Sequence, residues 1–198
     1  MSYLMDQPMR DRVPPYILYT GKLTVAECEK LIAYAQRQGT RAATVGNASA
    51  AREVPATRKS RVAWAYSTAE TRWLYDKLNA VADDARRHWY PFDLSGFHEP
   101  VQLTHYSGSE LGHYSAHKDL AAGRSSTRKL SMVALLNDPK EFEGGQLEML
   151  AAPSHARQAK LGQGSLVVFP AYELHRVTPV THGQRWSAVV WVHGPPFR

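Results

Sequence analysis

The sequence is poor in cysteine and has no long apolar run. Its single cysteine, Cys28, has no partner for a disulfide within the chain. The longest uninterrupted apolar runs, such as residues 166–170, are far shorter than the roughly 20 residues that cross a bilayer. Residues 1–10 contain no apolar stretch of the kind that marks a secretory signal. These absences predict a cytoplasmic protein of a reducing compartment, with no membrane partner.

The sequence also lacks internal repeats and low-complexity segments, and its composition is that of an ordinary soluble protein. Hydrophobic residues make up 43% and charged residues 21% of its 198 positions. A chain of this length suits one domain with a substantial core. We therefore expect residues 1–198 to form a single domain. The composition makes no prediction of oligomeric state.

Basic residues outnumber acidic ones, 24 to 18, and part of the excess lies in residues 40–61. That segment contains Glu53 as its one acidic residue, and its basic residues are Arg41, Arg52, Arg58, Lys59 and Arg61. One interpretation is a solvated loop. The other is a basic rim that attracts an acidic substrate, a carboxylate or a phosphate. Aromatic residues do not alternate with these charges, so nucleic acid is not favoured as a partner.

Two helices are expected in the first half of the chain. Thr24-Val-Ala-Glu27 has the pattern of a capping box and predicts a helix to about Gln38, ended by Gly39. Ser67-Thr-Ala-Glu70 has the same pattern and predicts a second helix, stopped by Pro91. Their expected buried stripes are Cys28, Leu31, Ile32 and Ala35 in the first, and Leu74, Leu78, Val81, Ala85 and Trp89 in the second. We expect both helices on one face of a sheet.

Short apolar stretches separated by turn residues dominate the chain after residue 100. We expect strands at residues 16–20 and 61–66, with a mobile connection over residues 40–60 between the first helix and the second of these strands. Eight further strands are expected near 101–106, 113–117, 130–136, 146–150, 155–159, 165–169, 174–179 and 185–193. Such a series is typical of a sandwich or jelly roll. Residues 120–128 are small and polar and are a candidate lid.

Three residues have the chemistry and spacing of metal ligands. His117 and Asp119 are two apart, and side chains at i and i+2 of a strand point to one face. His175 lies in Phe169-Pro-Ala-Tyr-Glu-Leu-His-Arg-Val-Thr-Pro-Val180 and would be the third ligand. Two imidazoles and one carboxylate suit Fe(II), although Mn, Co, Ni or Zn can occupy such ligands in vitro. A cupin-like metal protein would fit these three ligands equally well.

The remaining histidines are interpreted individually. His113 lies four residues before His117, and two interpretations are open: a histidine with no role at the site, or one that contacts the ligands or faces the substrate. His105 alternates with Tyr106, so it faces away from the site if Tyr106 faces it. The others, His88, His98, His155, His182 and His193, are given no role.

Several segments, in this order and at this spacing, resemble the 2-oxoglutarate- and Fe(II)-dependent oxygenases of the prolyl-4-hydroxylase-like group. They are Gln102-Leu-Thr-His-Tyr106, His117-Lys-Asp119, Gly144-Gly145, Gly164-Ser-Leu-Val-Val-Phe-Pro170, His175-Arg-Val-Thr-Pro-Val180 and Arg185-Trp-Ser187. The resemblance implies an α+β fold with a double-stranded β-helix (jelly-roll) core at residues 101–198. Residues 1–100 would form a supporting region of helices and strands. It also implies His117, Asp119 and His175 as catalytic metal ligands.

The resemblance further implies a cosubstrate site. Arg185 follows His175 by ten residues, across a turn expected at residues 181–183, which places it on the next strand. In the family, the residues matching Arg185 and Ser187 bind the far carboxylate of 2-oxoglutarate, and the one matching Tyr106 offers a hydroxyl. Many animal prolyl hydroxylases have lysine at the position of Arg185, which weakens a collagen-type assignment. Related halogenases have a small residue at the position of Asp119, so the carboxylate favours hydroxylation.

From this resemblance we expect a hydroxylase that couples oxidative decarboxylation of 2-oxoglutarate to hydroxylation of a C–H bond. The implied cofactors are Fe(II), 2-oxoglutarate and O2, with ascorbate in support. The preferred substrate is a peptidyl or amino-acid (prolyl-like) side chain in a peptide, a protein or a small molecule. The alternatives are a non-catalytic jelly-roll module that binds 2-oxoglutarate or an acidic ligand, and an oxygenase of the same chemistry acting on a small metabolite or nucleic acid.

Overall fold

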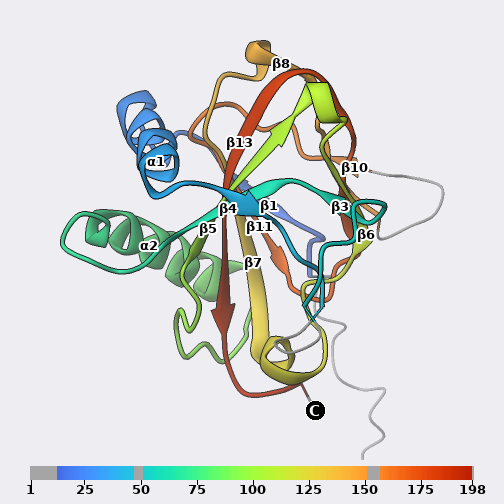
Figure 1. The fold of residues 1–198 in the computed structure, drawn as a ribbon. Helices are drawn as coiled ribbons and strands as arrows, with labels where there is room; N and C mark the ends of the chain where they lie inside the picture. Colours follow the sequence, from blue (N-terminus) through green and yellow to red (C-terminus); the bar gives the residue numbers. More distant parts are fainter. Residues whose placement is uncertain (1–12, 47–50, 151–156, 198) are drawn as a thin grey trace, which may run out of the picture.

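A computed structural model describes residues 13–46, 51–150 and 157–197 of the chain, which form two helices and a set of mostly short strands (Figure 1). The helices are α1 (Val25–Gln38) and α2 (Arg72–His88). The strands before residue 120 are β1 (Ile17–Tyr19), β2 (Arg41–Ala42), β3 (Arg58–Lys59), β4 (Arg61–Ala65), β5 (Val101–Ser107) and β6 (His113–His117). The later strands are β7 (Arg128–Leu135), β8 (Phe142–Gly144), β9 (Leu147–Met149), β10 (Arg157–Gln158), β11 (Leu166–Pro170), β12 (His175–Val177) and β13 (Val180–His193). No helix among the described residues is long and apolar enough to span a membrane.

The strands form two antiparallel sheets. The larger has the order β1-β11-β7-β13-β5-β4-β2, with β8 pairing to β13 at one end, and the smaller has the order β10-β9-β12-β6-β3. Consecutive strands alternate between the sheets over much of the second half of the chain. An apolar cluster with members from both sheets fills the space between them; it includes Tyr106, Val133, Leu147, Phe169 and Val177. The predicted α+β double-stranded β-helix is confirmed.

The strands expected after residue 100 are present, with one difference in where a strand begins. The turn expected at residues 181–183 is wrong, because β13 begins at Val180 and His182 and Gly183 pair with β8. Gly183 has φ +72°, and a Cβ there would lie 1.9 Å from the carbonyl oxygen of Glu141. The glycine therefore permits a close approach of two strands at an irregular point of the ladder, where the sequence suggested a loop. The strand expected at 155–159 lies partly outside the described residues.

Helix α1 agrees with its sequence signals. The Thr24 hydroxyl accepts a hydrogen bond from the amide of Glu27, and the Glu27 carboxylate accepts one from the amide of Thr24. The capping box thus satisfies two of the amides that a helix start leaves without partners. Gly39 follows the last turn with φ +75°. The predicted inner residues Cys28, Leu31 and Ala35 are buried, and Ile32 is half-buried.

Helix α2 begins later than expected. It starts at Arg72, so the predicted capping box at residues 67–70 is wrong. Its N-cap residue, Thr71, donates its hydroxyl to the carbonyl of Tyr66 and makes no side-chain cap bond. Trp89 was also assigned wrongly to the buried stripe: its side chain is exposed, and Tyr90 occupies the core instead. The helix ends at His88, so helical spacing no longer applies at Trp89.

Both helices lie against the outer face of the larger sheet, as predicted (Figure 1). One apolar cluster joins α1 and α2 to β5, β7, β11 and β13; it includes Leu31, Leu74, Leu103, Met132 and Val190. Burial of this layer stabilises the larger sheet, by about 25 cal/mol per Å² of apolar surface removed from water. The inner face of the same sheet is left to line a cavity.

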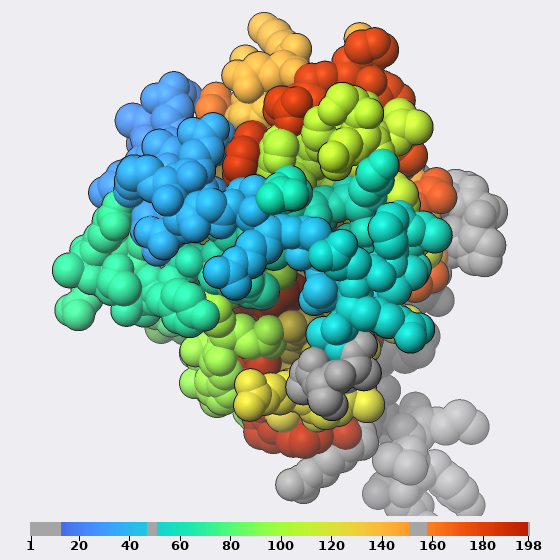
Figure 2. Space-filling view, viewed as in Figure 1, coloured from blue at the N-terminus to red at the C-terminus, as the bar shows by residue number. Residues whose placement is uncertain are grey.

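Residues 40–61 do not form the simple connection that the sequence suggested. Here β2 and β4 extend the larger sheet, β3 is the edge strand of the smaller one, and Val45 bridges Arg52. Residues 47–50 lie outside the described part of this segment. The space-filling view shows its blue and cyan residues side by side across the middle of one face (Figure 2). The basic segment therefore contributes edge strands to both sheets and forms one wall of the space between them.

Candidate active site

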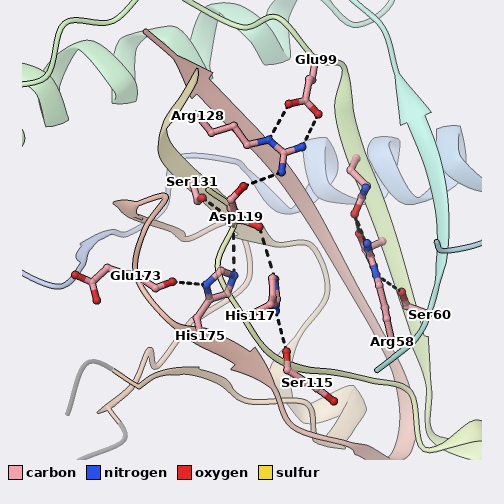
Figure 3. Close-up of polar contacts among 12 residues, drawn as sticks. Arg58, Ser60, Glu99, Ser115, His117, Asp119, Arg128, Ser131, Glu173 and His175 are labelled. Atoms are coloured by element: carbon pink, nitrogen blue, oxygen red, sulfur yellow. Dashed lines mark hydrogen bonds and ion pairs between the residues drawn. The ribbon is translucent and has the colours of Figure 1, made fainter. Parts of the chain in front are cut away.

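The structure brings His117, Asp119 and His175 together at one end of the space between the sheets. β6 and β12 pair so that His175 lies opposite His117. Nε2 of His117 is 3.6 Å from Oδ1 of Asp119, and Nε2 of His175 is 3.6 Å from Oδ2 of the same carboxylate. One ligand atom from each residue lies within 4.8 Å of the others (Figure 3). Three donors that converge in this way can share one metal ion.

Backbone carbonyls orient the two imidazoles. Nδ1 of His117 donates a 2.8 Å hydrogen bond to the carbonyl of Ser115, and Nδ1 of His175 donates a 2.9 Å bond to that of Glu173 (Figure 3). A carbonyl oxygen only accepts, so in the neutral rings Nδ1 carries the proton and Nε2 offers its lone pair. Such outer hydrogen bonds fix the tautomer and direction of metal-binding histidines.

Asp119 is buried and held from several sides. Its Oδ2 accepts a 2.6 Å hydrogen bond from Ser131, and its backbone carbonyl accepts a 3.2 Å bond from Arg128. Burial alone would raise the pKa of the carboxyl group, but its electrostatic interactions with His175 and His117 and the hydrogen bond from Ser131 outweigh it and hold this pKa well below its usual range. β6 ends at His117, so the position of Asp119 is set by these contacts and not by strand alternation.

These donors fit an Fe(II) ion. Two neutral imidazoles and one ionised carboxylate, with no thiolate, are the ligands of the facial triad, which leaves coordination positions open. Among the described residues this is the only group of three or more histidine, cysteine, aspartate or glutamate side chains with metal-ligand spacing. His113 does not join it, because its ring nitrogens face the carbonyls of Leu111 and Ala56.

The triad opens into a cavity of about 490 Å³ between the sheets. Arg185 and Ser187 lie on its wall from β13, with Tyr106 directly opposite Arg185 on β5. Nη1 of Arg185 donates a 3.1 Å hydrogen bond to the Ser187 hydroxyl, and the guanidinium lies 5.4 Å from the centre of the Tyr106 ring. His105 is on the other face of β5, stacked on Trp186. All three predicted cosubstrate residues therefore share the cavity of the triad.

Arg185 is a buried cation without a counterion. Its side chain is 2% exposed, and no carboxylate of the described residues lies within ion-pair distance. Burial lowers the pKa of its guanidinium, which shows how unfavourable the isolated charge is here. An unpaired buried charge costs several kcal/mol. The site is therefore complementary to a carboxylate or similar anion from outside the protein.

A second group of cavity residues was given no individual role on sequence grounds, although Arg58 belongs to the basic segment for which an acidic substrate was considered. The Tyr114 ring stacks on His117 with 3.5 Å between ring centres, and the Arg58 guanidinium lies 4.6 Å from the Tyr114 ring. Arg58 donates hydrogen bonds to Gln102 at 2.6 Å and Ser60 at 3.0 Å. The alternation of Gln102 with Tyr106 along β5 could have placed Gln102 in the cavity. The position of Arg58 depends on β3 pairing with β6, which no local signal predicts.

The far wall of the cavity contains another arginine. Arg128 donates two hydrogen bonds to Glu99, at 2.8 and 2.6 Å, and its guanidinium lies 3.7 Å from the Trp191 ring (Figure 3). Trp191 lines the cavity. The candidate lid contains a short 3₁₀ helix, η4 (Gly123–Thr127), and Ser125 in it borders the cavity. Its function as a lid stays a prediction.

Sequence comparison relates the second half of the chain to a known family. Residues 101–193 match the family model of the 2OG-Fe(II) oxygenase superfamily. A PKHD-type hydroxylase of Teredinibacter turnerae is 41% identical over 86 residues, which cover 41% of this chain and 38% of that protein. One from Janthinobacterium is 37% identical over 100 residues, covering 47% of this chain and 42% of that protein. The match thus spans about two fifths of the length of these relatives.

Structural comparison extends the likeness to nearly the whole chain. A prolyl-4-hydroxylase of Pseudomonas putida superposes with a TM-score of 0.69 at 19% identity, covering 90% of this chain and 92% of that one. A prolyl hydroxylase of Trichoplax adhaerens gives 0.72 at 15%, covering 90% and 83%. At such identities the likeness establishes a shared fold, into which the family match and the triad geometry fit. Residues 101–193 therefore match the 2OG-Fe(II) oxygenase superfamily, and the chain shares the fold of the solved prolyl hydroxylases.

Proposed function

We propose that the protein is a 2-oxoglutarate- and Fe(II)-dependent hydroxylase. His117, Asp119 and His175 hold the metal, while Arg185 and its neighbours Ser187 and Tyr106 hold the cosubstrate. The observation that carries the proposal is the buried, unpaired guanidinium of Arg185 in the same cavity as the triad. A metal site alone would not need that cation.

Each residue of the site has a distinct task. The carbonyls of Ser115 and Glu173 hold the two imidazoles with Nε2 toward the metal position. Ser131 restrains Oδ2 of Asp119 and leaves the other carboxylate oxygen free for the metal. When bound, Fe(II) and 2-oxoglutarate supply the activation of O2 that the oxidation of a C–H bond requires. The protein supplies fixed ligands and a largely buried cavity.

Arg185 positions the cosubstrate. A guanidinium binds a carboxylate through two parallel hydrogen bonds, which set its direction as well as its affinity. Ser187 is already bonded to Nη1 and can offer its hydroxyl proton to the same carboxylate. Tyr106 faces this point from β5 and adds a phenolic hydroxyl. The keto-acid end of the cosubstrate is then free to reach the metal.

The substrate and setting are further parts of the proposal. A peptidyl or amino-acid side chain, in a peptide or a small molecule, is the preferred substrate; the solved Trichoplax adhaerens prolyl hydroxylase is in complex with a peptide fragment. We assign residues 1–198 to one domain, with residues 1–100 as support and residues 101–198 as the catalytic core. The reaction would run in the cytoplasm, with ascorbate keeping the metal reduced.

Succinate formation tests the proposal. The purified protein is incubated with Fe(II), ascorbate, 2-oxoglutarate and O2, and succinate is measured against a matched His175→Ala preparation. We expect slow succinate formation without a second substrate, and none in the variant. If the protein binds 2-oxoglutarate in an oxygen-free titration but never forms succinate with any substrate supplied, it is a non-catalytic module that binds an acid.

A further inference from the structure

Two arginines flank the triad, and they differ in whether they have a counterion. Arg128 is neutralised by Glu99, which accepts two hydrogen bonds from it. Arg58 is half-buried on another side of the triad (Figure 3), and no described carboxylate lies within ion-pair distance of it. Its hydrogen bonds go to the neutral side chains of Gln102 and Ser60. The positive charge of Arg58 is therefore uncompensated on the cavity wall.

The whole cavity has an excess of positive charge. Its lysine and arginine residues are Arg41, Arg58, Lys118, Arg128 and Arg185. Asp119 is the only carboxylate among the described residues that line it. Glu99, which pairs with Arg128, and Asp119 together offset two of these five positive charges. A divalent metal with the dianion of 2-oxoglutarate adds no net charge. Three positive charges remain even when the proposed site is filled, so the cavity favours a third, acidic occupant.

Arg58 is also close to the reactive centre. The Tyr114 ring lies between its guanidinium and His117. The centre of that ring is 4.6 Å from the guanidinium and 3.5 Å from the centre of the His117 ring. If a ligand placed its carboxylate at Arg58, the carbon atoms a few bonds from that carboxylate would therefore lie beside the metal position. The apolar part of such a molecule would lie against Trp64 and Val189, which line the same region.

The contacts of Arg58 leave part of its guanidinium available. Among the described residues its hydrogen bonds use Nε and Nη2. These bonds, together with the ring of Tyr114 below it, hold the group in place. An arginine fixed in this way has lost its side-chain freedom before any ligand arrives, so less entropy is lost on binding.

We propose that Arg58 binds a carboxylate of the molecule that is hydroxylated, so that the substrate is an acid whose reacting C–H lies a few bonds from that carboxylate. This assignment rests on the proposed function and names the substrate class of the same site. The carboxylate has two sources, the α-carboxylate of a free amino acid or an acidic side chain in a peptide. Arg41 and Lys118 strengthen the local field without being fixed, because both are exposed.

The test uses paired compounds that differ in one charge. A panel of free L-amino acids and a panel of short peptides containing Asp or Glu are each assayed as the acid and as the corresponding amide. The first readout is stimulation of succinate formation, with hydroxylation detected as a gain of about 16 Da. The second is calorimetric binding of the best compound to protein loaded with Zn(II) and 2-oxoglutarate without oxygen, which does not depend on turnover.

We expect at least one acid to stimulate turnover and to bind at least about tenfold more tightly than its amide, because the amide cannot form a charge-assisted pair. Arg58→Gln should weaken binding of the acid by a similar factor and leave binding of the amide little changed. The panel that contains the tightest-binding acid shows whether the carboxylate is that of a free amino acid or that of an acidic side chain in a peptide. Arg61→Gln removes the same charge from the outside of β4, where Arg61 bonds Thr40, and should behave as the parent protein.

Four results overturn the inference. One is that no compound of either panel stimulates turnover, another is that amides act as well as acids, and the third is that Arg58→Gln binds the best acid as tightly as the parent. A loss of 2-oxoglutarate affinity in Arg58→Gln as large as the loss of substrate affinity also overturns it, because it would assign Arg58 to the cosubstrate. Failure of the underlying proposal is separate, since it appears in the parent protein as no binding of 2-oxoglutarate or as no succinate formation in the absence of a second substrate.

Discussion

Arg185 and Ser187 lie two residues apart on one face of β13, and the arginine donates a 3.1 Å hydrogen bond to the serine hydroxyl. Both side chains are at most 2% exposed, on the wall of the cavity that contains the triad. The serine hydroxyl is a weak substitute for a carboxylate, because it carries no charge. The pair is therefore prepared for an anion and incompletely satisfied without one.

Arg185→Ala should weaken 2-oxoglutarate binding strongly. Loss of one partner of a buried charged pair costs about 3–5 kcal/mol, since the remaining charge is left without compensation. At 1.4 kcal/mol per factor of ten, this is roughly a hundredfold or more in affinity. Calorimetric titration of 2-oxoglutarate into metal-loaded, oxygen-free protein measures the effect.

Two further variants rank the contributions to the same binding. Arg185→Lys keeps the charge and loses the two-pronged geometry, so it should fall between alanine and the parent protein. Ser187→Ala removes one donor to a charged group and should cost about 1.5–3 kcal/mol. Arg86→Ala, on the exposed side of α2, is the control. Parental affinity in Arg185→Ala would mean that another cation of the cavity, such as Arg128, holds the acid.

Loss of a triad histidine should abolish turnover and leave the fold in place. His117→Ala or His175→Ala removes one of three donors, so Fe(II) affinity and succinate formation should both fall below detection. The large apolar layer under the helices does not involve these residues, so circular dichroism should be unchanged. His182→Ala, on an exposed side chain, is the matched control. Succinate formation at the parental rate in His175→Ala would remove that residue from the metal site.

Local sequence signals predicted the elements that depend on local physics. The capping box at Thr24 formed because its two partners are three residues apart. The ligand residues His117 and His175 were identified by residue type and order, and antiparallel pairing of their strands placed them together. Turn residues and apolar runs located most of the short strands. For the capping box and the short strands, the decisive signals lie within a few positions of the chain, whereas the two histidines meet only because β6 pairs with β12.

The late start of α2 arises from a competing local contact, whereas the error at Gly183 and the omission of Arg58 arise from contacts that are distant in sequence. Thr71 bonds the carbonyl of Tyr66 and so displaces the start of α2, although the pattern at residues 67–70 is a valid cap signal. Gly183 resembles a turn residue and serves instead a close contact with Glu141. Arg58 reaches the cavity only because β3 pairs with β6, more than 50 residues away in the chain. Such pairings cannot be read from a local pattern.

Cys28 should be unreactive in the folded protein. It is fully buried in α1, and burial, followed by the charge of Glu27, raises the pKa of its thiol to about 11. At pH 8 roughly one thiol in a thousand is then ionised, and the sulfur is also inaccessible. A disulfide reagent at pH 8 should give no fast phase, and one equivalent after addition of denaturant. A full equivalent within seconds in native buffer would contradict the burial of this residue.

Acid should weaken the clamp formed by Glu99, Arg128 and His193. Burial alone would raise the pKa of Glu99, but His193, whose Nε2 lies 3.1 Å from Oε1, and the hydrogen bonds from Arg128 outweigh it and lower this pKa to about 2. A carboxyl group whose pKa is lower in the folded than in the unfolded state stabilises the fold above its unfolded pKa of about 4.5, and this stabilisation is lost as the pH falls toward 2. At 1.36 kcal/mol per unit, the full effect is about 3 kcal/mol.

The Glu99→Gln variant tests this linkage. It removes the titrating group, so the free energy of unfolding should be lower than that of the parent at pH 6, and the difference should shrink as the pH falls from about 4.5 toward 2. Urea unfolding at a series of pH values measures both curves. Glu143→Gln is the control, because its exposed pair with His182 contributes little at any pH. Because Arg128 also bonds the carbonyl of Asp119, we expect Fe(II) affinity to fall in Glu99→Gln at pH 7. A difference in stability that stays constant from pH 6 to pH 3 would show that Glu99 does not titrate with a lowered pKa in the folded protein.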